Sequence, residues 1–265
     1  DRKDHLDYEL FKALEIMETP RKGPVWLDIP IDIQGSDYIA KEQKKYELTT
    51  SKSENIDVEM KNLYKAILNS KRPLIMAGGG IRAANAERYM SKLIDNFNIP
   101  VVSAYNGHDL FFEKSEKYIG RCGTQGDRRG NLAVECADLI IALGTSLNIR
   151  QIGYNYDDFA SDKFLCYIDV DPQELDKKTI KKNVDLAINV DIKYFLNKFT
   201  KKYKKHSEIH NEFLNWAKKV KIKYSTKNEI YQDTKKINPY KFVMELAKNT
   251  KPSDIFVTSN AMSAV

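Results

Sequence analysis

The stretch LIMAGGGIRAANAERYMSKLIDNFNIPVVSA, from Leu74 to Ala104, decides the fold class of this 265-residue chain. An apolar run over Pro73–Ala77 enters three glycines, Gly78–Gly80, and a pattern typical of a helix over Ala84–Phe97 follows. A second apolar run, Val101–Ala104, completes a strand–helix–strand unit. Both runs are apolar throughout rather than alternating with polar residues, which is typical of parallel strands that are covered on both faces.

The same alternation of strands and helices continues outward from this unit. We expect helices over Val58–Asn69 and Asn131–Ala137, and strands over Asp138–Leu143, Leu165–Val170 and Leu186–Val190. Strands that alternate with helices in this way form parallel sheets with helices on both faces. The sequence therefore predicts an α/β fold with a doubly wound parallel sheet, a Rossmann-like central domain that occupies residues 49–200.

Each end of the chain has the pattern of a piece of a further α/β unit. Leu6–Met17 has helical spacing and precedes a predicted strand over Val25–Ile29. Near the other end, Asn238 and Pro239 can begin a helix, which a predicted strand over Ile255–Thr258 follows. A single strand has no partner to pair with. We therefore expect partial α/β domains at both ends, residues 1–48 and 236–265, with a helical linker over residues 201–235.

Composition limits the classes of function. Hydrophobic residues make up 42% of the chain, enough for a packed core, and no apolar run reaches the roughly 18 residues of a transmembrane helix. The first ten residues are charged and have no apolar signal segment. The three cysteines have neither metal-ligand nor disulfide spacing. These features predict a cytoplasmic protein with no membrane partner, and they assign no metal ligand and no catalytic residue.

The net charge of +6 raises the question of a nucleic-acid partner. Lysines cluster over residues 198–223, but aromatic and aliphatic residues recur among them at helical spacing. This arrangement is typical of a helix with one packed side and one solvated side. The sequence therefore predicts no nucleic-acid partner.

Several polar loops follow the predicted strands. Gly78, Gly79 and Gly80 follow the first strand, and Gly144 and Thr145 follow DLIIAL. Asp169 lies in CYIDVD, at the end of the next strand. Ligands of open parallel sheets bind at the carboxyl ends of the strands, where helix N-terminal amides favour anions and an acidic side chain can bind a ribose hydroxyl. These loops predict a nucleotide crevice. The alternative is that the glycines only make a tight connection between strand and helix.

Two further features are open to more than one interpretation. In GTQGDRRGN, residues 123–131, Arg128 and Arg129 could clamp a phosphate, or one of them could pair with Asp127 and shape the loop. His108 is the only histidine in a predicted crevice loop, and we expect it to be exposed and structural rather than catalytic. No G-x-S-x-G motif of a hydrolase is present.

The order of motifs along nearly the whole chain resembles that of thiamine-diphosphate-dependent enzymes of the acetolactate synthase type. GPVWLDIPIDIQG resembles the end of the pyrimidine-binding domain of that family, and the final NPYKFVMELAKNTKPSDIFVTSNAMSAV resembles the start of its diphosphate-binding domain. The stretches that resemble its central domain are RPLIMAGGGIRAANA, IPVVSAYNGHD, GTQGDRRGNLAVECADLIIALGTSLNIRQIGYNYDDFA and CYIDVDPQELDK.

The resemblance implies a function. Such enzymes bind thiamine diphosphate and Mg²⁺ between subunits, decarboxylate a 2-oxo acid such as pyruvate, and transfer the acyl unit to an acceptor carbonyl. It therefore implies a transferase or lyase that self-associates as a dimer or tetramer. In acetolactate synthases the central domain also binds FAD, and the match would put Gly78–Gly80, Gly144, Thr145 and Asp169 beside that flavin.

The chain also departs from the pattern of the family. The glutamate that activates the cofactor is not identified, and the Gly-Asp-Gly stretch that helps to hold Mg²⁺ is absent. We therefore expect these 265 residues alone not to catalyse the reaction. The loop formed by Ser259, Asn260, Ala261, Met262 and Ser263 matches one that approaches the diphosphate, although Ala261 and Met262 replace a Gly-Gln pair. The alternatives are a stand-alone FAD- or NAD-binding module and a non-catalytic scaffold.

Overall fold

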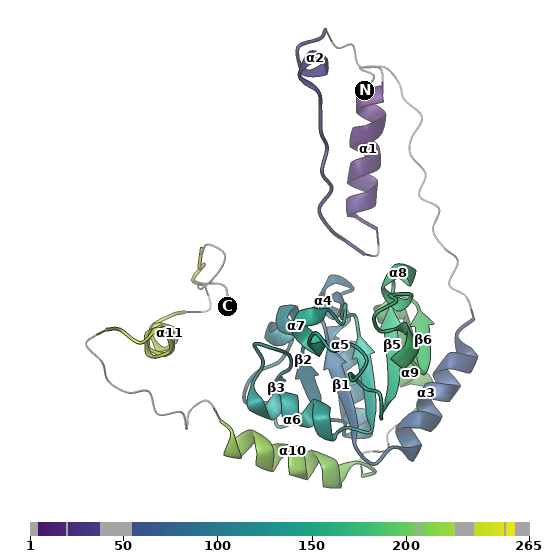
Figure 1. Cartoon of the computed structure of the whole chain (residues 1–265), viewed down its shortest axis with the longest axis vertical. Coiled ribbons are helices and arrows are strands. Elements are labelled where there is room, and N and C mark those ends of the chain that lie inside the picture. The colour runs from purple at the N-terminus through teal and green to yellow at the C-terminus, as the bar shows by residue number, and fades with distance from the viewer. Residues whose placement is uncertain are drawn as a thin grey trace.

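A parallel sheet of six strands is the centre of the computed structural model (Figure 1). The structure describes residues 5–19, 21–37, 55–204, 206, 208–225, 236–251 and 253–257. The strand order is β3-β2-β1-β4-β5-β6, and every neighbouring pair is parallel. The strands are β1 (Pro73–Ala77), β2 (Val101–Ser103), β3 (Tyr118–Arg121), β4 (Leu139–Leu143), β5 (Phe164–Asp169) and β6 (Leu186–Asn189).

Helices cover both faces of this sheet because alternate residues of each strand point to opposite sides. Ile75 and Ala77 of β1 pack into one core cluster, while Leu74 and Met76 pack into the other. The first cluster is covered by α3 (Asp57–Asn69), α4 (Gly80–Ala83), α5 (Glu87–Phe97) and α9 (Ile192–Lys202), and the second by α6 (Arg128–Cys136), α8 (Pro172–Leu175) and α10 (Asn211–Lys223). The predicted doubly wound α/β fold is confirmed.

The helix that was predicted over Ala84–Phe97 begins later, at Glu87, and the separate short helix α4 precedes it. Asn85 has φ = 50°, a left-handed conformation that ends α4, and α5 begins at Glu87. Asn98, with φ = 56°, ends α5 in the same way. Asparagine is among the few residues that adopt this conformation at low cost, so these two positions set the helix boundaries.

The strand β3 was not predicted. It lies inside a segment that reads as a long polar loop, and its run of apolar residues is only Tyr118 and Ile119. Tyr118 pairs with Val101 and Gly120 with Val102, across an irregularity in the register. A strand this short, at the edge of the sheet, leaves too few residues to show a period.

Helix α10 is tied to the rest of the sheet domain by polar contacts at both ends, and the contact at its start is buried. The ring nitrogens of His210, which is 1% exposed, lie 2.8 Å from the carbonyl oxygen of Phe97 and 3.0 Å from that of Ile67. At the other end of the helix, the Lys221 ammonium donates to the carbonyl oxygens of Ser115 and Tyr118 at 2.9 Å and 2.8 Å. The lysine-rich segment is therefore packed on one side, as its pattern predicts.

The two ends of the chain contain helices but no strand in their described residues. The helices are α1 (Leu6–Met17), α2 (Ile31–Gln34) and α11 (Pro239–Lys248), and they stand apart from the sheet domain in Figure 1. The strands predicted over Val25–Ile29 and Ile255–Thr258 are wrong for the described residues, since residues 22–30 and 254–257 have no regular secondary structure. The physical reason is that a strand needs a hydrogen-bonded neighbour, and these segments pair with none of the six described strands.

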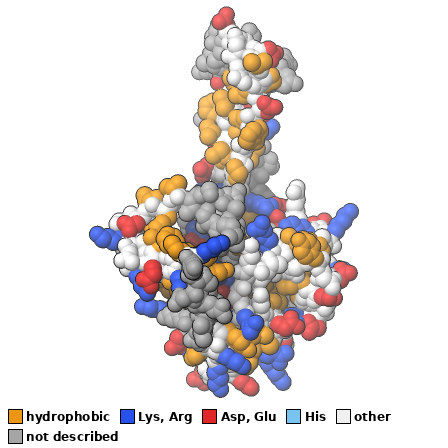
Figure 2. Space-filling model, turned by 60° about the vertical axis from the view of Figure 1, so that its left-hand side comes forward, with side chains coloured by type: hydrophobic (Ala, Val, Ile, Leu, Met, Phe, Trp, Pro, Cys, Tyr) orange, Lys and Arg blue, Asp and Glu red, His pale blue; other side chains and the backbone are white. Residues whose placement is uncertain are grey.

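Apolar side chains on these ends are accordingly exposed. Trp26 is 90% exposed and Phe256 56%, and neither joins the central sheet. On α1, Phe11 and Leu14 are also more than half exposed, and hydrophobic side chains are visible along the upper column of Figure 2. Single exposed apolar side chains are normal, but a concentration of them marks a surface that contacts something else.

Candidate functional site

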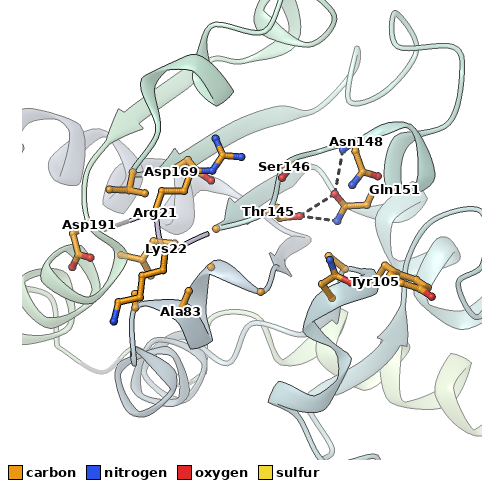
Figure 3. Close-up of a pocket in the computed structure, with 18 of the residues that line it drawn as sticks. Arg21, Lys22, Ala83, Tyr105, Thr145, Ser146, Asn148, Gln151, Asp169 and Asp191 are labelled. Atoms are coloured by element: carbon orange, nitrogen blue, oxygen red, sulfur yellow. Dashed lines mark hydrogen bonds between the residues drawn. The ribbon is translucent and has the colours of Figure 1, made fainter. Parts of the chain in front are cut away.

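A crevice of about 570 Å³ lies at the carboxyl ends of the strands (Figure 3). The strand order reverses between β1 and β4, which is where ligands bind in open parallel sheets. Its size falls within the range of pockets for small ligands and cofactors, about 300–1,000 Å³. The lining residues that carry polar side chains are Arg21, Lys22, Tyr105, Asn106, Thr145, Ser146, Asn148, Arg150, Gln151, Asp169 and Asp191.

The predicted glycines bring two loops together beneath this crevice. A Cβ atom on Gly78 would lie 2.1 Å from the carbonyl oxygen of Gly144, and one on Gly80 would lie 2.9 Å from the same atom. The amide of Gly78 donates to the carbonyl oxygen of Leu143 at 2.9 Å, and that of Gly80 to the Gly144 oxygen at 3.0 Å. These two amides are therefore engaged within the chain. Gly79 and Gly80 line the crevice, whereas Gly78 lies behind it.

The loop after β4 is held by Gln151 in the short helix α7 (Ile149–Ile152). Its buried amide nitrogen donates to the Thr145 hydroxyl at 2.7 Å, and its amide oxygen accepts from the Asn148 backbone at 3.3 Å (Figure 3). Asn148 completes a capping box, since its side chain accepts from the Arg150 amide at 3.0 Å. No helix was predicted for this stretch, although Asn-Ile-Arg-Gln carries the capping-box signal.

Asp169 is the most perturbed acid of the crevice. It lies at the end of β5 and is 8% exposed, and its Oδ1 accepts from the Asp171 amide at 3.0 Å. Burial raises the pKa of Asp169 to about 6, and the negative charge of Glu174 adds to that rise. A carboxylate that is held in this way can accept a hydrogen bond from a ligand hydroxyl at neutral pH.

The raised pKa of Asp169 predicts a pH-dependent stability. Its folded-state pKa lies above its unfolded value, so the penalty for burying the carboxylate is full above about pH 6 and vanishes below about pH 4. We expect Asp169→Asn, relative to the wild type, to be more favourable at pH 7.5 than at pH 4.5 by about 2 kcal/mol in unfolding free energy. Urea unfolding of both proteins at the two pH values measures this. A difference that does not change with pH would contradict it.

The opposite end of the crevice carries an aromatic ring and amides. The Arg150 guanidinium lies 6.0 Å from the centre of the Tyr105 ring, and Tyr105, Asn148 and Gln151 lie together in Figure 3. His108 is exposed, and its Nδ1 lies 2.6 Å from the Tyr105 carbonyl oxygen. His108 is thus exposed, as predicted, and it does not line the crevice. This end therefore offers a flat aromatic surface, neutral hydrogen-bonding groups and the positive charge of Arg150.

Of the two interpretations of the arginines in GTQGDRRGN, the contacts favour the structural one. Arg129 is 3% exposed, and its guanidinium lies 2.7 Å from the Glu113 carboxylate and 3.5 Å from that of Asp127. Burial acts to raise the pKa of Asp127, but hydrogen bonds from Arg121 and the charge of Arg129 outweigh it and hold that pKa below its ordinary value. Arg128 lies over the Tyr224 ring at 5.5 Å. Neither Arg128 nor Arg129 lines the crevice.

The predicted site residues thus divide into three groups. The crevice brings together Gly79, Gly80, Gly144, Thr145 and Asp169. Gly78 supports it from behind. The loop formed by Ser259, Asn260, Ala261, Met262 and Ser263 lies outside the described residues.

The sequence analysis missed several crevice residues. Asp191 follows β6 just as Asp169 ends β5, so its position gave a usable signal. Its carboxylate accepts from the Tyr194 amide at 2.8 Å and caps α9. Arg21 and Lys22 come from the distant N-terminal segment, and no local pattern could have placed them in the crevice.

Among the residues that the structure describes, no group of three or more His, Cys, Asp or Glu side chains is arranged to hold a metal ion. None of the described helices is both long and apolar enough to cross a bilayer. All three cysteines are free thiols, and burial raises the pKa of Cys122 to about 12.

Comparison with known proteins identifies the family of the sheet domain. Residues 60–199 match the model of the family described as thiamine pyrophosphate enzyme, central domain. The match covers just over half of the chain and includes all six strands. It therefore covers every crevice residue except Arg21 and Lys22.

Relatives with similar sequences carry names from one group of enzymes. The probable acetolactate synthase large subunit of Methanocaldococcus jannaschii is 30% identical over 246 residues, which are 90% of this chain and 40% of the relative. That of Methanococcus aeolicus is 31% identical over 194 residues, 71% of this chain and 32% of the relative. The chain thus spans about a third to two fifths of the length of these relatives. By its central sheet domain, the chain belongs to the thiamine pyrophosphate enzyme family.

Proposed function

We propose that this chain is the central part of a thiamine-diphosphate-dependent carboligase or lyase of the acetolactate synthase type. Such an enzyme decarboxylates a 2-oxo acid such as pyruvate and transfers the acyl unit to an acceptor carbonyl. The observation that carries the proposal is the family match over residues 60–199, together with relatives that are named acetolactate synthase large subunits. Bound thiamine diphosphate, with Mg²⁺, would supply the carbanion chemistry.

The same comparison supports the domain organisation that we propose. Similarity to the Methanocaldococcus relative extends over 90% of the chain, well beyond the sheet domain. This favours residues 1–48 as the end of a pyrimidine-binding domain, 49–200 as the central domain, 201–235 as a linker and 236–265 as the start of a diphosphate-binding domain. A stand-alone nucleotide-binding module or a scaffold would not require similarity outside the sheet domain. The intact protein would be a cytoplasmic dimer or tetramer.

Within this chain, the crevice would hold the adenosine diphosphate portion of a nucleotide such as FAD. The volume of about 570 Å³ and the Gly79–Gly80 backbone at its floor support this assignment. Asp169 would accept a hydrogen bond from a ribose hydroxyl, and Arg21, Lys22 and Arg150 provide positive charge for a diphosphate. Ser259–Ser263 would approach the diphosphate of the thiamine cofactor.

The activity is tested on a polypeptide that extends this chain on both sides to the length of its relatives. We expect CO₂ release from pyruvate that requires both added thiamine diphosphate and Mg²⁺, and the same polypeptide without thiamine diphosphate is the control. No release from pyruvate or from any other 2-oxo acid would contradict the proposal. The flavin is tested separately, by the visible absorbance of oxidised flavin that remains with the protein after FAD is added and the excess removed.

A further inference from the structure

The crevice is built from two parts of the chain that are far apart in sequence. Most of its lining comes from the loops that follow β1, β2, β4, β5 and β6, but Arg21 and Lys22 come from the segment after α1. In Figure 3 both cationic side chains lie at the same end of the crevice as Asp169 and Asp191. Removing the N-terminal segment would therefore leave the sheet domain with an incomplete crevice.

Arg21 connects these two parts by ion pairs. Its Nη2 donates to Glu174 Oε1 at 2.8 Å, and its Nη1 pairs with the Asp171 carboxylate. Both acids belong to the start of α8, and their side chains are only 9% and 16% exposed. A guanidinium that spans two largely buried carboxylates fixes geometry better than a single exposed pair does.

Lys22 differs from Arg21 in this respect. Its ammonium lies 3.0 Å from the carboxylate of Glu18, which lies at the end of α1 and outside the sheet domain. Lys22 therefore contributes positive charge to the crevice without an ion pair to the sheet domain. The two neighbours form a matched pair, because they have the same charge, line the same crevice and are 53% and 51% exposed.

Arg21 also sets the charge at that end of the crevice. Asp169, Asp171 and Glu174 bring three carboxylates to one place, and Lys177 pairs with Glu174 from the far side. When Arg21 is in place, it offsets the negative charge that a phosphate would otherwise meet there. Docking of the N-terminal segment and binding of an anion in the crevice therefore favour each other.

We propose that Arg21 is a positioning residue that couples docking of the N-terminal segment, residues 21–37, to occupancy of the crevice by an adenosine diphosphate moiety. The inference rests on the proposed nucleotide crevice. If the ligand binds the docked form more tightly, it must stabilise docking by the same factor, because the two equilibria are linked. Binding of a ligand in the sheet domain would then shift the docking equilibrium of residues 21–37.

The test compares Arg21→Gln with Lys22→Gln in the 265-residue chain, with ADP as the probe. Docking is measured by the rate of chymotryptic cleavage after Trp26, which is 90% exposed and unchanged in both variants. Without ligand, we expect R21Q to be cleaved about fivefold faster than the wild type and K22Q at the wild-type rate. ADP should slow cleavage of the wild type and K22Q, but not of R21Q.

Affinity for ADP, measured by calorimetry, is the second readout. K22Q removes only charge and should weaken binding about threefold, whereas R21Q also releases the segment and should weaken it about tenfold or more. Equal effects of the two substitutions on both readouts would overturn the coupling. If the wild type binds neither ADP nor FAD, the proposed nucleotide crevice itself is wrong. This result differs from equal losses of ADP affinity in the two variants, which would contradict only the coupling.

Asp171→Asn separates the ion pair from the charge of the crevice. The amide oxygen of asparagine can keep the hydrogen bond from the Gln173 amide, which is 2.8 Å in the wild type, so the start of α8 is retained. The pair between Arg21 and Asp171 is lost, the pair between Arg21 and Glu174 remains, and no cation is removed. D171N should therefore be cleaved faster than the wild type, but more slowly than R21Q, which loses both pairs. Cleavage at the wild-type rate would show that Arg21 does not hold the segment through this pair.

Discussion

Gly78→Ala should destabilise the sheet domain by about 4 kcal/mol or more, because the added methyl group would meet backbone atoms of the neighbouring loop. The added Cβ would lie 2.1 Å from the Gly144 carbonyl oxygen and 2.5 Å from the Thr145 Cβ. Neither obstacle is the flexible end of a side chain. The loops after β1 and β4 would have to separate, which would also break the bond from the Gly78 amide to the Leu143 oxygen.

Urea unfolding followed by circular dichroism measures this loss, and Gly35→Ala is the matched control. A Cβ on Gly35 would lie 3.5 Å from the Ile31 carbonyl oxygen, an ordinary contact. Gly35 also has φ = −86°, which alanine adopts without strain. We expect the control to change the unfolding free energy by less than about 0.5 kcal/mol. If G78A were as stable as G35A, the close approach of the two loops would be wrong.

This packing bears on whether the three glycines bind a phosphate or only make a tight connection between strand and helix. Gly78 and Gly80 let the β1 loop lie against Gly144, so a large part of their role is structural. Only Gly79 and Gly80 reach the crevice. A glycine-rich turn after a strand therefore does not by itself indicate a phosphate site, because close contact between two loops requires the same residues.

The central sheet could be predicted because its strands are long apolar runs with helices between them. Five of the six strands agree with the expected ranges to within one residue at each end. The exception, β3, could not be found, since its position depends on pairing with Val101 and Val102 rather than on its own pattern. The opposite error occurred at the ends, where Val25–Ile29 has the pattern of a strand but no described strand beside it.

The crevice was only partly predictable, for a different reason. Residues at the ends of predicted strands, such as Gly144 and Asp169, could be placed from topology alone. Arg21 could not, because its role depends on how a distant segment docks on α8. Likewise, the choice between two roles for Arg129 required coordinates, since Glu113 lies in a stretch with no predicted structure. Contacts between separate segments are therefore where the sequence was least informative.

Arg129→Met should lower the unfolding free energy by about 3 kcal/mol while leaving the affinity for ADP unchanged. Arg129 is 3% exposed, and its removal would leave the Asp127 carboxylate, whose side chain is 9% exposed, with Arg121 as its remaining cation. The crevice, by contrast, contains no atom of Arg129. The two interpretations of GDRR therefore predict different results. A structural role predicts a loss of stability, whereas a phosphate clamp predicts a loss of affinity for ADP.

Arg128→Met is the control for this substitution. It removes the same side chain from the adjacent position, where the guanidinium is exposed and lies over the Tyr224 ring, so a loss of about 0.5 kcal/mol is expected. Urea unfolding and ADP titration of both variants separate the cases. If the arginines form a phosphate clamp, at least one of the two variants must lose affinity for ADP while its unfolding free energy stays unchanged. Loss of stability in R129M alone means that these arginines hold the loop before α6, and that positive charge for a ligand must come from Arg21, Lys22 and Arg150.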